Sequence, residues 1–390
     1  MAVHGTSPGP RRLITRLPQC ANRCTAEEQR TNVISSSRID ASSLVDCEPR
    51  TDPPVCFASK NSLPPLSMET TEALPLIDCC PSSYSFREDV INGLQKPQKQ
   101  LSPKYLYDER GSKLFDDITR LDEYYPTRTE AAIMRDHIDE IADAIGENAM
   151  LVEYGSGSSE KTRILLDRIG SELTGYVPVD ISREHLLDAA QSIADAYPDL
   201  AVQPVCADYT SAFPLPSLEK EAARIVVYFP GSTIGNFGRE EATSFMRRMA
   251  ETAGPGGGLL IGVDLKKAPS ILRAAYNDRE GVTAAFNLNL LRRINRELGG
   301  DFDPSTFRHE ALWRPTPGRI EMHLVSEREQ EVRIGDHVFS FEKDETIHTE
   351  NSCKFSLDEF RRMAQVAEFQ IRSVWTDENT LFSVQYAEVA

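Results

Sequence analysis

The sequence has no long hydrophobic run, and this absence excludes one large class of proteins. No apolar stretch in its 390 residues approaches the roughly 20 residues that a helix needs to span a bilayer. Basic residues are also outnumbered, because 43 Lys and Arg oppose 60 Asp and Glu and leave a net charge of −17. Such a protein repels phosphate backbones. We therefore expect neither a membrane nor a nucleic acid as a partner, but a small-molecule or cationic ligand.

Cysteine is scarce in the part of the chain that has a folding pattern. Six of the eight cysteines precede residue 81, and only Cys206 and Cys353 follow. Thiols so few and so far apart are typical of a reducing compartment, so we expect a cytoplasmic protein. Cys20 and Cys24 have the spacing of half a zinc site, but no second ordered pair follows them. The seven histidines include no His-x-x-x-His pair either, and we expect no metal.

The first 85 residues differ in composition from the rest. They are rich in Ser, Pro, Thr and Arg and lack sustained periodicity, which is typical of a disordered tail. The first 45 residues have six arginines and only three acids, a composition that is also compatible with an organelle transit peptide. We assign residues 1–85 to a disordered N-terminal extension, with targeting as an open alternative.

From residue 86 the pattern is that of an α/β protein. Apolar residues at helical spacing predict one helix over residues 127–146, with Gly146 as its stop. Five short apolar runs then alternate with helical segments: "MLVEY", "YVPVDIS", "LAVQPVCADYT", "RIVVYF" and "GGLLIGVDL". This alternation predicts a parallel sheet with right-handed crossovers.

The last segment indicates how the sheet is completed. Ser356 and Glu359 have the spacing of a capping box, which predicts a helix start. Two β-rich runs follow, "QIRSVWTD" and "LFSVQYAEV". A helix and then a hairpin resemble the close of a seven-stranded, Rossmann-like class I methyltransferase sheet with an antiparallel C-terminal hairpin. Residues 86–265 and 355–390 would form this domain, and residues 266–354 an inserted α+β substrate-binding domain.

Polar residues at the ends of consecutive strands predict a nucleotide-like ligand. The turn "YGSGSSEKT" is neither a dinucleotide fingerprint, since Glu160 replaces the third glycine, nor a P-loop. Asp180, at the end of a strand, can accept both hydroxyls of a ribose, and Asp208 can accept from an adenine amino group. S-adenosylmethionine fits this set because it has a ribose and an adenine but no phosphate. The alternative is a plain turn with two surface acids.

Several stretches together resemble one enzyme family. They are "YLYDERGSKLFDDITRLDEYYPTRTE", "EYGSGSSEKT", "FPGSTIGNF", "GVTAAFNLNLLRRINRELGGDFD", "RIEMHL" and "TENSCKF". Over about residues 90 to 390 the chain is similar to the ergothioneine-pathway L-histidine Nα-methyltransferases. These enzymes use S-adenosylmethionine to trimethylate histidine to hercynine.

The resemblance implies a role for individual residues. The expected cofactor-binding residues are Gly155, Lys161, Asp180, Asp208 and Tyr209. The expected substrate-binding residues are Tyr124, Gly231, Asn236, Tyr276, Met322, Glu350 and Ser352, and the expected catalytic residues are Tyr107 and Asn236. Asn236 and Tyr276 would hold the amino and carboxylate groups, and Met322, Glu350 and Ser352 the imidazole.

The chemistry of these residue types agrees with such roles. Methyl transfer needs a neutral amine, which Asn236 can orient and whose proton a hydroxyl such as that of Tyr107 can relay. Glu350 and Ser352 are two apart and share a face of an extended chain, where a carboxylate and a hydroxyl can contact the two imidazole nitrogens. Two alternatives remain: another amino acid or indole amine as the substrate, or a cofactor-binding partner protein without activity. We expect a monomer.

Overall fold

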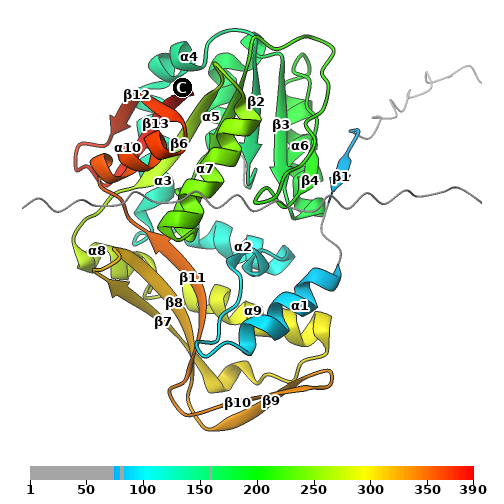
Figure 1. Cartoon of the computed structure of the whole chain (residues 1–390), viewed down its shortest axis with the longest axis vertical. Coiled ribbons are helices and arrows are strands. Elements are labelled where there is room, and N and C mark those ends of the chain that lie inside the picture. The colour runs from blue at the N-terminus through cyan, green and yellow to red at the C-terminus, as the bar shows by residue number, and fades with distance from the viewer. Residues whose placement is uncertain (1–73, 80–82, 158–159) are drawn as a thin grey trace, which may run out of the picture. The chain divides into compact units, whose positions relative to one another are not determined.

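The computed structural model describes residues 74–79, 83–157 and 160–390. An eight-stranded sheet forms one part of this region (Figure 1). From one edge to the other its strands are β1 (Ile77–Cys79), β4 (Val205–Ala207), β3 (Gly175–Asp180), β2 (Ala149–Tyr154), β5 (Arg224–Phe229), β6 (Gly258–Asp264), β13 (Phe382–Val389) and β12 (Phe369–Thr376). The first six are parallel, whereas β13 and β12 run antiparallel to their neighbours.

Seven of these strands confirm the Rossmann-like methyltransferase sheet. Numbered along the chain without β1, they lie in the order 3-2-1-4-5-7-6, with the antiparallel hairpin at one edge. The strand β1 is an addition, and it lies in the segment that we predicted to be disordered. It pairs with β4, which is far away in the sequence, so no local pattern could have indicated it. Residues 1–73, the rest of the predicted extension apart from a few positions, lie outside the described residues.

Helices cover both faces of the sheet, which explains why its central strands read as continuous apolar runs. Leu151 and Val152 are neighbours in β2 and point into different hydrophobic clusters. One face packs against α3 (Tyr125–Asp136), α4 (Ile138–Ile145), α5 (Glu160–Ile169) and α6 (Arg183–Ala196). The other face packs against α7 (Arg239–Ala253) and α10 (Leu357–Val366). The short helix η2 (Gly170–Glu172) follows α5.

The single helix predicted over residues 127–146 is two helices. The break is at His137, whose backbone (φ −120°, ψ 20°) ends α3 and precedes α4. The His137 ring contacts Glu140 and lies 6.5 Å from the Trp375 ring of β12. The break therefore coincides with a tertiary contact that helical periodicity does not report. The predicted stop is confirmed, because α4 ends at Ile145 and Gly146 has a φ of +76°.

The second part of the described region is a smaller sheet with helices (Figure 1). The strands β11 (Thr346–Cys353), β8 (Arg319–Ser326) and β7 (Phe307–Arg314) form an antiparallel sheet, and β9 (Gln330–Ile334) and β10 (His337–Phe341) form a hairpin. Its helices are α8 (Pro269–Ala275), α9 (Val282–Leu298) and η4 (Pro304–Thr306). Three N-terminal helices belong to the same hydrophobic cluster: α1 (Ser83–Leu94), η1 (Pro103–Leu106) and α2 (Glu109–Thr119). The chain thus contributes to this part before it forms the other strands of the large sheet, from β2 onward.

Two further observations bear on the expected environment. The described residues include no helix that is both long and apolar enough to cross a bilayer. Cys79 and Cys353 are free thiols, whereas Cys206 is disulfide-bonded. The cysteines therefore lend no support to the reducing compartment that their distribution suggested.

The capping box at the start of α10 is present as predicted. The Ser356 hydroxyl accepts from the Glu359 amide at 3.2 Å, and the Glu359 carboxylate accepts from the Ser356 amide at 2.9 Å. We expect Ser356→Ala to lower the free energy of unfolding by about 1 kcal/mol, because one helix amide loses its acceptor. Chemical denaturation measures this loss. Ser356→Thr keeps the hydroxyl and serves as the control; an equal loss in both variants would contradict the capping role.

Candidate active site

A cavity of about 920 Å³ opens along the carboxyl ends of the parallel strands and extends to β11. A smaller cavity of about 50 Å³ adjoins it, on the side of the small sheet. The two share several wall residues, among them Tyr107, Tyr124, Gly231, Asn236 and Glu350. The crevice beyond the carboxyl ends of the strands is where open α/β sheets bind ligands.

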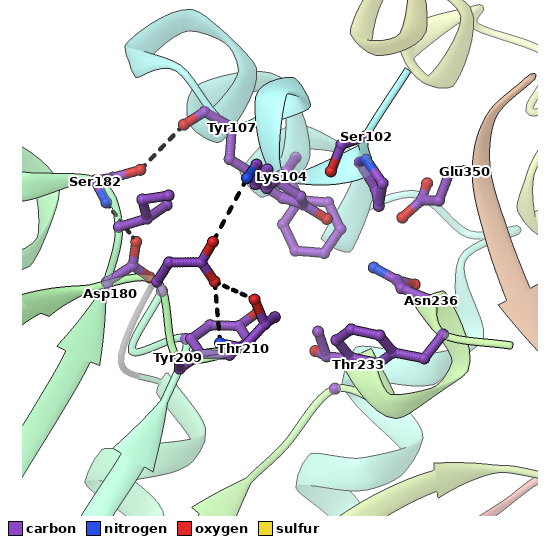
Figure 2. Close-up of a pocket in the computed structure, with 18 of the residues that line it drawn as sticks. Ser102, Lys104, Tyr107, Asp180, Ser182, Tyr209, Thr210, Thr233, Asn236 and Glu350 are labelled. Carbon is purple, nitrogen blue, oxygen red and sulfur yellow. Dashed lines mark hydrogen bonds and ion pairs between the residues drawn. The ribbon is translucent and has the colours of Figure 1, made fainter. Parts of the chain in front are cut away.

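Two aspartates stand at strand ends on the wall of the large cavity, and Figure 2 shows one of them, Asp180. Asp180 ends β3, and its Oδ1 accepts from the Ser182 amide at 2.8 Å. Asp208 follows β4, and its Oδ1 accepts from the Thr210 amide at 3.0 Å and from the Thr210 hydroxyl. Lys104 lies 3.5 Å from the other oxygen of Asp208. Burial raises the pKa of Asp180, although backbone hydrogen bonds oppose the rise. Both oxygens of Asp208 thus have a partner in the protein, although a carboxylate oxygen can accept a second hydrogen bond from a ligand.

The glycine turn between β2 and α5 leaves room and polar atoms at the same wall. Gly155 has a φ of +76°, a backbone conformation that favours glycine. The Ser156 hydroxyl is buried and has no hydrogen-bond partner among the described residues. The Tyr209 ring stacks on Tyr154, with centroids 5.6 Å apart and planes 15° apart. This wall thus offers two aspartate acceptors, the Ser156 hydroxyl and the face of the Tyr209 ring. These groups fit a nucleoside that has no phosphate.

Lys161 lines the large cavity and is paired with a buried carboxylate, that of Glu130, which the sequence analysis did not predict. Its Nζ lies 2.6 Å from Oε2 of Glu130, which is only 1% exposed. The same Glu130 oxygen accepts from the backbone amide of Gly231 at 2.9 Å. Lys161 and Glu130 therefore fix the turn after β5, where Gly231 has a φ of +79°. This turn leads directly into η3 (Thr233–Asn236).

The small cavity brings together a carboxylate, an amide and a thioether. Glu350 in β11 pairs with Met322 in β8, so the two side chains share one face of the small sheet. The Asn236 amide donates a hydrogen bond to the Glu350 carboxylate, and Figure 2 shows the two side chains facing each other. Burial raises the pKa of Glu350 to about 7, although the charge of Lys354 and the bond from Asn236 oppose the rise.

Aromatic rings enclose the remaining walls of the small cavity. The Tyr124 ring meets the Tyr276 ring edge-on at 6.2 Å, and the Tyr107 ring meets the Phe286 ring at 5.4 Å. Burial raises the pKa of Tyr107 well above its ordinary value, and the Glu350 charge raises it further. Tyr107 is therefore a neutral phenol that can both donate and accept a hydrogen bond.

Residues 86–389 match the family of histidine-specific, S-adenosylmethionine-dependent methyltransferases. The chain belongs to this family. Over 302 residues it is 43% identical to the histidine N-alpha-methyltransferase of Mycolicibacterium smegmatis, an alignment that covers 76% of this chain and 92% of that protein. It is 42% identical to the histidine N-alpha-methyltransferase of Mycobacterium tuberculosis, over 78% and 94% of the two chains. Ergothioneine biosynthesis protein 1 of Neurospora crassa is 32% identical, over 71% of this chain and 32% of that protein.

The structure gathers the predicted site residues into two groups. All five predicted cofactor residues line the large cavity of this family member: Gly155, Lys161, Asp180, Asp208 and Tyr209. The predicted substrate and catalytic residues all line the small cavity: Tyr107, Tyr124, Gly231, Asn236, Tyr276, Met322, Glu350 and Ser352. Among the described residues, no group of His, Cys, Asp and Glu is placed to hold a metal ion.

Buried charges beside the small cavity were missed at the level of the sequence. Asp264 and Lys354 are 1% and 0% exposed and lie 2.6 Å apart. Signals for both were available. Asp264 ends a strand, as Asp180 does, and Lys354 continues the period of two that groups Glu350 with Ser352. No such signal existed for Glu130, whose partners come from α5 and the turn after β5.

Asp180 offers a direct test of the large cavity. We expect Asp180→Asn to weaken binding of S-adenosylhomocysteine about 10-fold to 100-fold, because a hydrogen bond to a charged acceptor contributes about 1.5–3 kcal/mol. Calorimetric titration of the purified protein measures the change. The exposed Asp199→Asn is a control with the same change of charge. Equal affinities of the two variants would contradict a ribose-binding role for Asp180.

Proposed function

We propose that this protein is an L-histidine Nα-methyltransferase. It would convert L-histidine through its mono- and dimethyl forms to trimethylhistidine (hercynine), the first step of ergothioneine biosynthesis. The observation that carries the proposal is the meeting of Glu350 with Asn236 in a small aromatic-walled cavity beside the cofactor crevice. The two relatives named histidine N-alpha-methyltransferase support it, because they align over almost their whole length.

The amine end of the substrate would lie against Asn236 and Tyr107. When bound, S-adenosylmethionine supplies a methyl group on a positively charged sulfur. An α-ammonium has no lone pair, so the protein must hold the amine in its neutral form or take up its proton. The Asn236 side chain carries no charge and orients the amine without repelling the sulfonium. Tyr107 is a neutral phenol, which can pass a proton through its hydroxyl without becoming a phenolate.

The ring end of the substrate would lie against Glu350 and Ser352. Both side chains belong to β11, are buried, and line the small cavity. The Glu350 carboxylate can accept a charge-assisted bond from one ring N–H. A carboxylate that is buried without such a donor is unfavourable, so the site disfavours amino acids whose ring has no N–H. Met322, which pairs with Glu350 across the strands, supplies an apolar surface for the ring.

Product analysis tests the proposal directly. The purified protein, incubated with L-histidine and S-adenosylmethionine, should yield trimethylhistidine by mass spectrometry. L-tryptophan in place of histidine should yield no comparable product. Methylation of tryptophan alone would support another amine as the substrate. Binding of S-adenosylhomocysteine without methylation of either amino acid would support a cofactor-binding protein without activity.

Tyr107→Phe tests the relay of the proton. Loss of the hydroxyl should lower kcat about 100-fold or more, which is in the range of a lost proton transfer. The affinity for S-adenosylhomocysteine should stay within about twofold, because the ring is retained. Tyr197→Phe, which removes a hydroxyl bound to Asp167 outside both cavities, is the control. A kcat of Tyr107→Phe equal to that of the control would remove the relay role.

The pKa of Glu350 predicts how the preference for histidine depends on pH. Since burial raises this pKa to about 7, the carboxylate acceptor is present above pH 7 and is lost as the pH falls below it. Glu350→Gln should therefore raise the KM for histidine about 10-fold to 100-fold at pH 8, through loss of a charged acceptor. The wild-type to Glu350→Gln ratio of kcat/KM cancels the ionisation of free histidine. It should fall as the pH is lowered from 8 to 6, and a constant ratio would contradict the assignment.

Each protein chain would act alone. The monomer expected from the sequence stays a prediction. Light scattering with multi-angle detection would test it. The cytoplasmic location expected from the distribution of cysteines stays a prediction, and cell fractionation tests it. The possible transit peptide lies outside the described residues.

A further inference from the structure

Lys354 lies beneath the small cavity, and the proposed mechanism does not yet use it. Its side chain is fully buried, and its Nζ has three partners. These are Asp264 Oδ2 at 2.6 Å, Ser352 Oγ at 2.7 Å and the Tyr276 hydroxyl at 3.0 Å. A lysine ammonium has three N–H donors and no acceptor, so these contacts use all of its donors. Both hydroxyls must therefore accept from Lys354.

The two hydroxyls are also bonded to each other. The Tyr276 hydroxyl lies 2.6 Å from Ser352 Oγ. The pair has two protons, and one of them occupies this mutual bond, whichever oxygen donates it. Neither hydroxyl has a further acceptor among the described residues. Since both side chains line the small cavity, one O–H proton is left for a group inside it.

Asp264 stabilises the buried ammonium of Lys354 through an ion pair. Its carboxylate also accepts from the Tyr125 hydroxyl at 2.8 Å and contacts Lys267. Burial alone would raise the pKa of Asp264, but the charges of Lys354 and Lys267 outweigh that effect and lower it. An unpaired buried charge is strongly unfavourable, and Asp264 gives the Lys354 ammonium a carboxylate partner. The orientation of the hydroxyl pair is therefore built into the protein before any ligand enters.

We propose that Lys354 is a positioning residue, which fixes the Tyr276–Ser352 pair as a hydrogen-bond donor to the unprotonated ring nitrogen of histidine. Tyr276 would then serve the ring, and not the substrate carboxylate that the family resemblance assigns to it. The inference rests on the proposed function. Glu350 is on the same strand and accepts from the ring N–H, so the cavity presents one acceptor and one donor. A neutral imidazole has the complementary donor and acceptor. Without the ammonium, the hydroxyls regain free lone pairs and no longer present a fixed donor.

The test compares two ligands of the protein loaded with S-adenosylhomocysteine. L-histidine has a ring N–H and a ring lone pair, and 3-(2-thienyl)-L-alanine has a five-membered aromatic ring with no nitrogen. Calorimetric titration gives the affinity of each ligand. In Lys354→Met, histidine should bind about 10-fold more weakly or worse, as expected when a donor is lost. The affinity for thienylalanine should change less than about twofold. Lys266→Met removes a half-exposed lysine paired with Glu359 and should change neither affinity.

The outcomes separate this inference from the proposed function. Wild-type protein that neither binds nor methylates histidine would overturn the proposed function. Wild-type protein that methylates histidine, with Lys354→Met weakening both ligands equally or neither of them, would overturn the positioning role alone. Lys354→Met leaves Asp264 one partner short, so Asp264→Asn combined with Lys354→Met removes both charges and should show the same selective loss. If neither variant folds and binds S-adenosylhomocysteine, Lys354 is purely structural and the inference fails.

Discussion

The active site depends on a close backbone contact between η3 and β11. A Cβ atom at Gly235 would lie 2.8 Å from the Cys353 carbonyl oxygen, closer than real Cβ contacts, so only glycine allows this approach. Asn236 follows strand β5 of the large sheet, and Glu350 belongs to strand β11 of the small sheet. The contact between η3 and β11 brings these two residues together. The turn that leads into η3 has consecutive left-handed residues, Gly231 and Ser232. The Gly231 amide donates to the Glu130 carboxylate, and the Asp264 amide donates to the Ser232 hydroxyl oxygen. These two hydrogen bonds hold the strained conformation.

Two buried carboxylates of this site each have a lysine partner. Glu130 pairs with Lys161 below the turn, and Asp264 pairs with Lys354 below the small cavity. Such pairs contribute little net stability, because desolvation offsets most of their attraction. They do fix the direction in which hydrogen bonds point, and a site that must hold a neutral amine and a neutral ring benefits from fixed donors and acceptors. Glu350 is different, because its carboxylate faces the cavity and its pKa is about 7.

The sequence predicted those site residues whose position follows from a local pattern along the chain. Strand ends predicted Asp180 and Asp208, and the period of an extended chain grouped Glu350 with Ser352. The same two patterns are present at Asp264, which ends a strand, and at Lys354, which continues the alternation of Glu350 and Ser352. Other features depend on residues distant in the chain. The strand β1 requires the edge of β4, the break at His137 coincides with a contact to β12, and the buried state of Glu130 depends on a partner in α5. No spacing along the chain indicates these.

In the proposed site, histidine is held across the contact between η3 and β11. A double-mutant cycle on Asn236→Ala and Glu350→Ala measures it, with calorimetric affinity for L-histidine in the presence of S-adenosylhomocysteine as the readout. If both side chains hold the same ligand through one hydrogen-bonded group, their effects should be coupled by about 0.5–3 kcal/mol. Free-energy changes that add to within about 0.3–0.5 kcal/mol would mean that the two residues act independently, and would contradict the account.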